Sequence, residues 1–317
     1  MEKVLNGKPV ATLLDRASIK LINEHGIIPQ MLLIQVGNDS ASAYYVQSII
    51  KHGTKLGCKT TLKQLPENTS EQELLDFIKA ANSDPAINGI MIQKPLPKHI
   101  NDNAINFAIN PDKDLDCLHP LNLGKIMIEA DGLLPCTPAA VYYLMRYYHI
   151  DPMGKNLVIL GRSSVVGKPL ANILLWKKAF TNATVTVCHS KTNNLKDITR
   201  NADILIAAIG KSNFVGSDMV KENAILLDVG INEIINEEGK SKYVGDVDYN
   251  SCLDKAIAIT PVPGGIGRIT TSVLFLNLIK ACFVQIGVNK TIDEFITFIF
   301  NANQEDKNQM FGRNDAN

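Results

Sequence analysis

The chain has 317 residues, 45% of them hydrophobic and 20% charged, which is typical of a globular protein with two domains. Lysine plus arginine and aspartate plus glutamate number 32 each, so no net charge recruits nucleic acid or an anionic membrane surface. The six cysteines form no C-x-x-C pair. No signal peptide or apolar run of about 18 residues is evident. These features predict a cytoplasmic protein with reduced thiols, bound to neither nucleic acid nor membrane.

The first half of the chain alternates helical and strand patterns. Apolar spacing predicts a helix from Pro9 to His25, and Gly26 ends it. A capping signature at residues 69–73 starts a further helix. Buried strands that alternate with helices predict a parallel sheet. The remaining elements expected here are strands at 31–37, 59–65 and 87–93 and a helix at about 41–56.

Two segments then separate this region from the next strand. Residues 110–116 form a dense run of charge between apolar elements, a pattern typical of a solvated turn. Pro138 follows the sequence Pro135-Cys136-Thr137 and suits the first position of a helix. We therefore expect a helix at about 138–148.

Residues 156–177 have the pattern of a dinucleotide-binding βα unit. A short apolar strand is followed by a loop with Gly161 and Gly167 and then by an apolar helix. Such a unit offers its helix N-terminus to a pyrophosphate. The spacing is G-x-S-x-x-x-G, which places Ser163 where the backbone would approach a phosphate. The loop alone is also compatible with tight helix–sheet packing without a ligand. Further strands at 183–188, 203–208 and 224–229 predict a doubly wound domain.

The residues after the second strand of this unit indicate which cofactor it binds. An acidic residue there would bind the ribose hydroxyls of NAD, but the sequence is His189-Ser190-Lys191-Thr192. Arg162 lies in the phosphate loop itself. Cations and hydroxyls suit a 2′-phosphate, so NADP is favoured over NAD. The alternative is that Lys191 only caps a loop.

The last part of the chain begins with a loop rich in proline and glycine, residues 260–267. A long helix is expected from Thr270 to Ile286, and a short amphipathic helix at 291–300. The polar tail, 301–317, is expected to be disordered. The pattern between 243 and 259 is too weak to assign, and no metal site is expected.

Together these motifs resemble the bifunctional methylenetetrahydrofolate dehydrogenase/methenyltetrahydrofolate cyclohydrolase family. The resemblance extends from about Val4 to Ile286. No single motif is decisive, but their order along the chain is specific. The motifs are Tyr45-Val46, Gly89 to Pro97, Pro111 to Asp116, Pro135 to Pro138, Gly161 to Ser163 with Val166 to Pro169, and Pro261 to Gly265.

The resemblance implies an α/β fold of two domains with the active site in the cleft between them. Residues 1–137 and 272–300 would form the βαβ parallel-sheet domain with the folate site. Residues 138–271 would form the Rossmann-like, doubly wound NADP domain. Similar proteins are cytosolic homodimers joined through the NADP domain.

The resemblance also implies an activity in one-carbon metabolism. Methylenetetrahydrofolate loses hydride to NADP, and water then opens the methenyl product to formyltetrahydrofolate. Tyr45 would stack near the pterin, Gln93 would hydrogen-bond in the catalytic cluster, and Asp116 would accept hydrogen bonds from the pterin. The residues implied to hold NADP are Gly161, Arg162, Ser163, Ser190 and Ile231, and the substrate loop is Pro263, Gly264 and Gly265.

The departures from the family pattern lie on the folate side. The catalytic lysine of the family falls one helical turn after the tyrosine, where this chain has Ile49. His52, three residues on, is a possible substitute acid or base, although a partly exposed surface histidine is the commoner case. Cys117 replaces a glycine of the family and Arg268 a proline. Because Arg268 precedes a helix start, where a cation is disfavoured, we expect it to meet an anion such as the glutamate tail of folate.

Three hypotheses follow. The first is an NADP-dependent dehydrogenase with weak or absent cyclohydrolase activity. The second is a fully bifunctional enzyme in which another group replaces the lysine. The third is a non-catalytic folate- or nucleotide-binding relative, which the retention of Gln93 and Asp116 disfavours.

Overall fold

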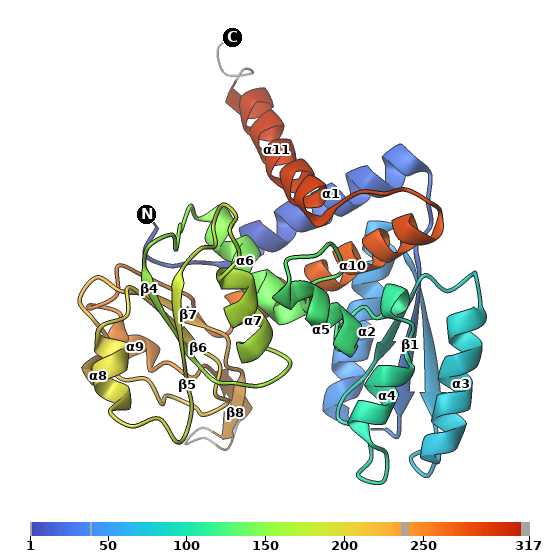
Figure 1. Cartoon of the computed structure of the whole chain (residues 1–317), viewed down its shortest axis with the longest axis horizontal. Helices are drawn as coiled ribbons and strands as arrows, with labels where there is room; N and C mark the ends of the chain where they lie inside the picture. The colour runs from blue at the N-terminus through green and yellow to red at the C-terminus, as the bar shows by residue number, and fades with distance from the viewer. Residues whose placement is uncertain (1, 39, 236–238, 240, 312–317) are drawn as a thin grey trace. The chain divides into compact units, whose positions relative to one another are not determined.

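The computed structural model describes residues 2–38, 40–235, 239 and 241–311, without the side chains of 40–44 and 302–311 (Figure 1). The chain divides into two compact units. Unit 1 comprises Met1–Thr12, Ile126–Glu129 and Pro135–Thr270. Unit 2 comprises Leu13–Lys125, Ala130–Leu134 and Thr271–Asn317.

The first twelve residues group with unit 1, whereas the sequence predicts that residues 1–137 share one domain. The cause is a backbone pairing at the edge of the unit 1 sheet. The N–H of Leu5 donates to the carbonyl of Ile259 at 2.9 Å, and the N–H of Ile259 donates to the carbonyl of Lys3 at 2.8 Å. The amino-terminal segment thus extends a sheet formed more than 150 residues later in the chain.

Unit 1 is built on a five-stranded parallel sheet with strand order β10-β7-β6-β4-β5 (Figure 1). In this order β4 lies between β5 and β6, so the chain crosses over within the sheet, as a doubly wound fold requires. The predicted Rossmann-like domain is therefore confirmed. The strands are β4 (Asn156–Leu160), β5 (Thr184–Cys188), β6 (Ile204–Ala207), β7 (Ile225–Asp228) and β10 (Ala258–Ile259). A separate antiparallel hairpin pairs β8 (Asn232–Ile235) with β9 (Ser241–Val244).

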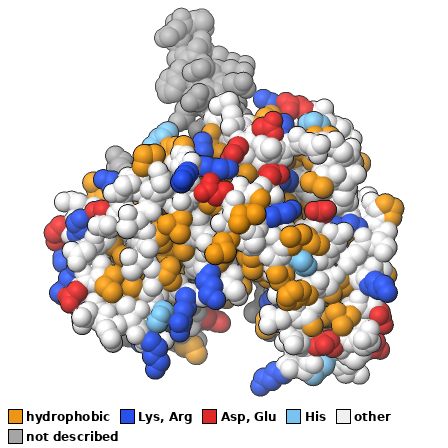
Figure 2. Space-filling view, in the orientation of Figure 1, with side chains coloured by type: hydrophobic (Ala, Val, Ile, Leu, Met, Phe, Trp, Pro, Cys, Tyr) orange, Lys and Arg blue, Asp and Glu red, His pale blue; other side chains and the backbone are white. Residues whose placement is uncertain are grey.

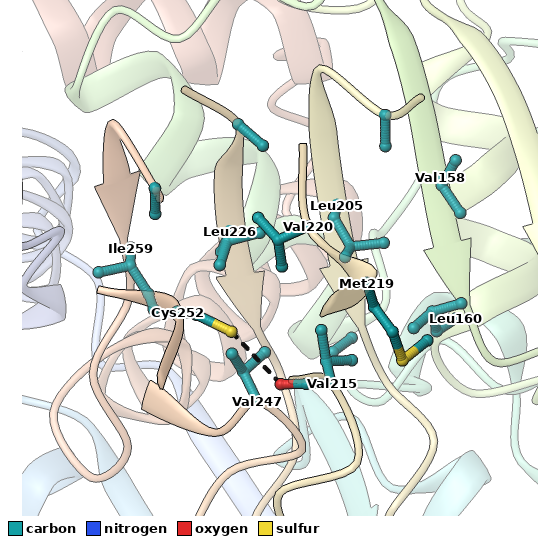
Figure 3. Packing of buried hydrophobic residues seen from close by; sticks show 14 of the residues in the cluster. Val158, Leu160, Leu205, Val215, Met219, Val220, Leu226, Val247, Cys252 and Ile259 are labelled. Atoms are coloured by element: carbon teal, nitrogen blue, oxygen red, sulfur yellow. Dashed lines mark hydrogen bonds between the residues drawn. The ribbon is translucent and has the colours of Figure 1, made fainter. Parts of the chain in front are cut away.

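Helices cover both faces of this sheet. On one face, α8 (Leu195–Arg200), η2 (Ser217–Met219) and α9 (Tyr249–Cys252) enclose a core of buried apolar residues, among which Cys252 Sγ donates to the carbonyl of Val215 at 3.4 Å (Figure 3). The other face carries α7 (Gly167–Leu174), on which α6 (Cys136–Tyr147) packs. Helix α6 begins two residues before the expected start, so Pro138 is its third residue and not its first.

Unit 2 contains the three-stranded parallel sheet that the sequence predicts, in the order β2-β1-β3. Its strands are β1 (Gln30–Val36), β2 (Lys59–Leu65) and β3 (Gly89–Ile92). Helices α3 (Glu71–Ser83) and α4 (Asp102–Ala108) pack against one face through an apolar core. Helix α2 (Ser40–Leu56) contacts β2.

The predicted capping box of α3 is confirmed. The Oγ of Ser70 accepts the N–H of Glu73 at 3.2 Å, and the Glu73 carboxylate accepts the N–H of Ser70 at 2.8 Å. Two more helices, α1 (Gly7–His25) and α10 (Thr270–Gln285), also match their predicted ranges closely. Helices α4 and α5 (Pro120–Met127) were not expected from the sequence.

The charged run at residues 110–116 is not a solvated turn, because Lys113 and Asp114 are buried. Lys113 lies at the carboxyl end of α3. Its Nζ donates to the carbonyls of Asp84 at 2.7 Å and Ala81 at 3.3 Å. The Asp114 carboxylate accepts the N–H of His119 at 2.7 Å. Partners distant in sequence therefore satisfy these charges.

The last helix, α11 (Ile292–Phe311), extends past residue 300, where the sequence predicts that a disordered tail begins. Its first turns bury four apolar side chains at the spacing of one helical face, and the helix continues from that anchored end to Phe311. Residues 312–317 lie outside the described part of the chain. The buried residues are Ile292, Phe295, Ile296 and Ile299.

Acidic and basic side chains are intermixed on the face of the molecule in Figure 2. Among the described helices, none has the length and apolarity needed to span a membrane. None of the six cysteines, all of which lie in the described ranges, forms a disulfide. Within the described ranges, no group of three or more His, Cys, Asp or Glu residues is arranged to hold a metal ion.

Candidate functional site

The nucleotide loop of unit 1 connects β4 to α7, and backbone packing fixes its two glycines. Gly161 has a φ of +127°, which favours glycine, and a Cβ there would overlap the carbonyl of Ala208. A Cβ on Gly167 would overlap the carbonyl of Gly161. The loop is therefore as tight as a dinucleotide turn requires, with the N-terminus of α7 at the carboxyl edge of the sheet.

Ser163 shapes this loop from within. Its Oγ accepts the N–H of Val166 at 3.1 Å, and its carbonyl accepts the N–H of Lys168 at 3.0 Å. These hydrogen bonds fix the backbone conformation at the start of α7. The expected contact of Ser163 with NADP stays a prediction.

Arg162 and Ser190 lie at the carboxyl ends of two adjacent strands. Leu160 of β4 pairs with Cys188 of β5, and each of the two polar residues follows two positions later. Both side chains are exposed and make no hydrogen bond or ion pair with any described residue. Exposed Lys191 lies beside Ser190. A guanidinium, a hydroxyl and an ammonium at one edge can bind a phosphate.

The turn after β5 closes on itself and leaves Ser190 and Lys191 facing outward. The N–H of Thr192 donates to the carbonyl of His189 at 2.9 Å, and the N–H of His189 donates to Thr192 Oγ1 at 2.9 Å. His189 and Thr192 are thus engaged with each other. The side chains of the two residues between them, Ser190 and Lys191, are exposed and so accessible to a ligand.

Ile231 and the loop 263–265 also belong to unit 1. Ile231 follows β7 and is exposed, and a Cβ on Gly267 would lie 3.0 Å from its Cδ1. Gly264 has a φ of +115°, and its carbonyl accepts the N–H of Gly7 at 2.8 Å. The loop that contains Pro263, Gly264 and Gly265 is therefore held by the start of α1.

Two buried carboxylates, Asp228 and Asp246, organise the loops at this edge and were missed in the sequence. Asp246 accepts the N–H groups of Ile209 at 2.6 Å, Gly210 at 3.0 Å and Lys211 at 2.9 Å. Its Oδ1 also accepts Asn232 Nδ2 at 2.9 Å. It thereby connects the loop after β6 to the residue that follows Ile231.

Asp228 supports the same loops from the end of β7. Its carboxylate accepts the N–H groups of Gly230 at 3.0 Å, Asp246 at 3.0 Å and Val247 at 2.9 Å. Burial raises the pKa of Asp228 to about 6, although these donors act in the opposite direction. The signal in the sequence is the neighbouring glycines, because a Cβ on Gly245 would overlap the Asp228 carboxylate.

In unit 2, the structure brings Gln93 and Asp116 to the same edge of the small sheet. Ile90 of β3 forms a parallel bridge with Asp114. Asp116 follows in a turn that the N–H of Cys117 closes on the carbonyl of Asp114 at 3.1 Å, and Gln93 follows the end of β3. Gln93 Nε2 donates to the carbonyl of Lys94 at 2.7 Å. Its Oε1 is buried and has no partner among the described residues. A ligand N–H could bind that acceptor.

Asp116 is partly exposed, and its carboxylate makes no hydrogen bond to a described residue. Burial raises its pKa to about 7, the negative charge of Asp114 acts in the same direction, and the positive charge of Lys94 opposes both. Asp116 is thus an acceptor without a partner that titrates near neutrality, as perturbed groups at functional sites often do.

Helix α2 presents Tyr45 and Ile49 in different environments. Tyr45 is 37% exposed, whereas Ile49, one turn later, is 0% exposed. The close packing continues at Gly53, where a Cβ would lie 2.6 Å from Thr60 Oγ1 and 2.8 Å from the Phe275 ring. Position 49 is therefore an apolar core position that supplies no proton.

His52 lies against α1 and α10. Its Nε2 is 2.9 Å from Asp15 Oδ1, which also accepts the hydroxyl of Ser272 at 2.7 Å. The ring stacks on Phe275 with centroids 5.5 Å apart. These contacts hold the histidine within the packing of three helices.

The two other departures occupy distinct settings. Cys117 has a φ of +56°, a conformation that favours glycine, which explains why a glycine suits this position. Its Sγ donates to the carbonyl of Leu133 at 3.2 Å. Arg268 is exposed at the end of η3 (Ile266–Arg268), two residues before α10.

Comparison with known proteins identifies the same two regions. The catalytic domain of tetrahydrofolate dehydrogenase/cyclohydrolase matches residues 5–116. The NAD(P)-binding domain of tetrahydrofolate dehydrogenase/cyclohydrolase matches residues 135–286. The bifunctional protein FolD of Ruminiclostridium cellulolyticum is 45% identical over 289 residues, which cover 90% of this chain and 99% of that protein.

Solved structures agree with the sequence comparison. The bifunctional enzyme FolD, methylenetetrahydrofolate dehydrogenase/cyclohydrolase, of Campylobacter jejuni is 40% identical with a TM-score of 0.83, covering 88% of this chain and 98% of that one. The Trypanosoma brucei methylenetetrahydrofolate dehydrogenase-cyclohydrolase, solved with NADP cofactor and inhibitor, is 32% identical with a TM-score of 0.82. That match covers 90% of this chain and 99% of the other.

Proposed function

The chain belongs to the tetrahydrofolate dehydrogenase/cyclohydrolase family, and we propose that it oxidises methylenetetrahydrofolate with NADP but has a weak or absent cyclohydrolase step. The match to both domains of the family supports the oxidation step. The burial of Ile49, where the family has its catalytic lysine, supports the weak or absent cyclohydrolase step.

Unit 1 would hold NADP through the edge formed by β4 and β5. The tight turn of Gly161 and Gly167 lets backbone N–H groups approach the pyrophosphate. Arg162 and Ser190 would bind the 2′-phosphate, with Ser163 and Ile231 completing the contacts. Bound NADP supplies the hydride acceptor, so the protein has only to bind and orient it.

Unit 2 would bind the pterin through Gln93 and Asp116. Loss of hydride builds positive charge on the folate, which an ionised Asp116 stabilises. The buried Oε1 of Gln93 would accept an N–H of the ligand. The exposed ring of Tyr45 would stack on the pterin. None of these roles needs the lysine, because oxidation depends on binding and orientation.

Hydrolysis of the methenyl product has a different requirement. Water must be delivered to the one-carbon bridge and protons must be moved, which is general acid–base work typically contributing about 10²–10⁴-fold. Ile49 has no group that can do it. His52 is the second candidate, but its Nε2 is engaged with Asp15.

A fully bifunctional enzyme and a non-catalytic binding protein are the alternatives. One purified sample assayed for both half-reactions distinguishes all three. With methylenetetrahydrofolate and NADP we expect NADPH to form while the methenyl compound accumulates. Rapid decay of added methenyltetrahydrofolate above the buffer rate would identify a bifunctional enzyme, and failure to form NADPH would identify a binding protein.

The protein is also expected to be a cytoplasmic homodimer joined through unit 1. Cysteines that form no disulfide fit a reducing compartment. The β8–β9 hairpin exposes Ile235 at 77% and Tyr243 at 48%, and a second copy could bury both. Light scattering on the wild type and on Ile235→Glu would test this: a dimer that becomes a monomer supports it, and a wild-type monomer refutes it.

A further inference from the structure

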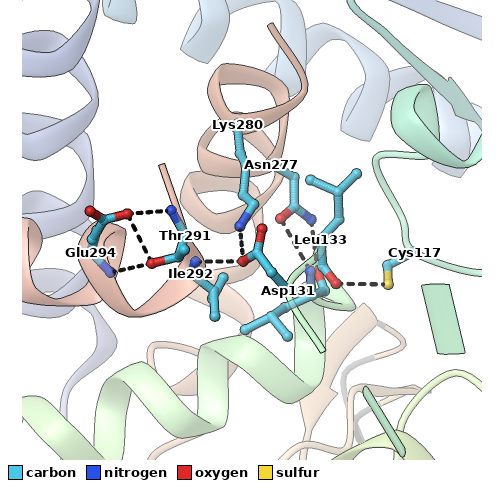
Figure 4. A network of polar contacts seen from close by, with 9 residues as sticks. Cys117, Asp131, Leu133, Asn277, Lys280, Thr291, Ile292 and Glu294 are labelled. Carbon is cyan, nitrogen blue, oxygen red and sulfur yellow. Dashed lines mark hydrogen bonds and ion pairs between the residues drawn. The ribbon is translucent and has the colours of Figure 1, made fainter. Parts of the chain in front are cut away.

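Helix α11 lies beyond residue 286, where the match to the NAD(P)-binding domain ends, yet its first turn is bonded to a segment that leads to the folate site (Figure 4). The N–H of Ile292 donates to Asp131 Oδ1 at 2.6 Å. Lys280 Nζ donates to the same oxygen at 2.6 Å. The Lys280 side chain is only 4% exposed, so its ammonium depends on this carboxylate.

The same network reaches both neighbours of Asp116. Asn277 lies one turn before Lys280 on α10, and its Nδ2 donates to the carbonyls of Leu134 at 2.7 Å and Leu115 at 2.8 Å. Cys117 Sγ donates to the carbonyl of Leu133 at 3.2 Å. The segment that starts at Asp131 is thus bonded to Cys117 directly (Figure 4) and to Leu115 through Asn277.

Asp116 needs such support from its neighbours. Its own carboxylate has no hydrogen bond to a described residue, so its position depends on how the main chain on either side is held. Cys117 occupies a left-handed conformation that side chains rarely adopt. The contacts of Leu115 and Cys117 therefore hold the carboxylate in position.

We infer that Asp131, Lys280 and Asn277 are positioning residues for Asp116 and so set the affinity for folate. The inference depends on the proposed role of Asp116 in binding the pterin. Helix α11 meets this support at the main-chain N–H of Ile292, which a substitution at Thr291 leaves in place.

The test variant is Asp131→Asn in the full chain, which keeps the shape but removes the charge that Lys280 and the Ile292 N–H share. We expect the KM for methylenetetrahydrofolate to rise about tenfold, the effect of weakening one charge-assisted hydrogen bond. The KM for NADP should stay within about twofold, because the two described hydrogen-bond partners of Asp131, Lys280 and Ile292, both belong to unit 2.

Thr291→Ala is the matched control at the same helix terminus. Thr291 caps α11, since its Oγ1 accepts the N–H of Glu294 at 3.3 Å and donates to the Glu294 carboxylate at 2.9 Å. The variant should lower Tm as a lost cap does but leave the folate KM unchanged. A folding effect alone would move both variants alike.

Two further variants keep the test decisive. If Asp131→Asn does not fold, Asp131→Asn with Lys280→Met leaves no buried charge unpaired and should show the same rise in folate KM. Asn277→Ala, which removes the hydrogen bond to the carbonyl of Leu115, should also raise the folate KM. A folate KM in the Asp131 variants equal to that of Thr291→Ala overturns the inference. A wild type that forms no NADPH overturns the proposed function instead.

Discussion

His52 Nε2 lies 2.9 Å from Asp15 Oδ1, an oxygen that also accepts the hydroxyl of Ser272. The three residues come from α1, α2 and α10 of unit 2. A carboxylate shared in this way restrains the imidazole ring and leaves it little freedom to follow a substrate. His52, which the sequence suggests as a substitute for the missing lysine, is therefore part of the helix packing.

We expect His52→Ala to lower the free energy of unfolding by about 1–3 kcal/mol, because the buried Asp15 loses a partner. The ring also loses its stacking on Phe275. Dehydrogenase activity should stay near that of the wild type, and His52→Gln should recover part of the stability. Denaturant unfolding and NADPH formation measure the two effects. If the wild type hydrolyses methenyltetrahydrofolate and His52→Ala does not, the histidine is the acid–base group after all.

Ile49→Lys should gain methenyl hydrolysis of at least about tenfold, since it restores a general acid–base group. Burial lowers the pKa of a lysine toward operating pH, which suits it to this work. The same burial should cost about 3–5 kcal/mol of stability if the ammonium finds no partner. Ile49→Met, similar in size and uncharged, is the control and should gain nothing. Robust hydrolysis in the wild type would contradict the premise.

Arg162→Ala should raise the KM for NADP by about tenfold or more while that for NAD changes little, because the guanidinium binds the 2′-phosphate. Lys155→Ala, an exposed cation just before the amino end of β4, is the control for net charge. Steady-state kinetics with both cofactors gives the comparison. Equal effects of Arg162→Ala on the two cofactors would show that the arginine does not read the phosphate.

The pH dependence of kcat/KM for folate should follow Asp116, whose pKa is raised to about 7. Only the ionised carboxylate stabilises the positive charge on the pterin, so kcat/KM should rise with pH through about 7 and then level off. Lys94 lowers this pKa, and Lys94→Met should move the midpoint upward. Lys98→Met, an exposed lysine of the same loop, should not. A profile that is flat across neutral pH would exclude Asp116 as the titrating group.

Arg268→Gln should weaken binding of polyglutamylated folate more than that of the monoglutamate, because an exposed cation before a helix is expected to meet the anionic tail. The loss should be about threefold to tenfold, as for one solvent-exposed charge pair. Titration with both forms of the substrate tests it. Unchanged binding of both would leave Arg268 as a surface cation.

Much of the fold could be predicted because its signals are local. The capping box of Ser70 and Glu73 spans four residues, and it formed as predicted. Apolar runs predicted strands β1 to β7, and glycines at 161 and 167 marked the nucleotide turn. Strand β10 was not predicted, because the pattern between 243 and 259 is weak. Such patterns depend on helix and strand periodicity and on turn chemistry, which a short window of sequence contains.

The sequence by itself thus determined the family, most strands of the two sheets and the strand ends at which Arg162, Ser190 and Gln93 lie. Only the tertiary structure decided which groups are already engaged. Asp15 meets His52 across 37 residues, Asp131 meets Lys280 across 149, and Leu115 meets Asn277 across 162. Hydrogen bonds between such distant residues exist because packing brings separate segments of the chain together. That packing makes His52 and Lys113 structural and leaves Asp116 available.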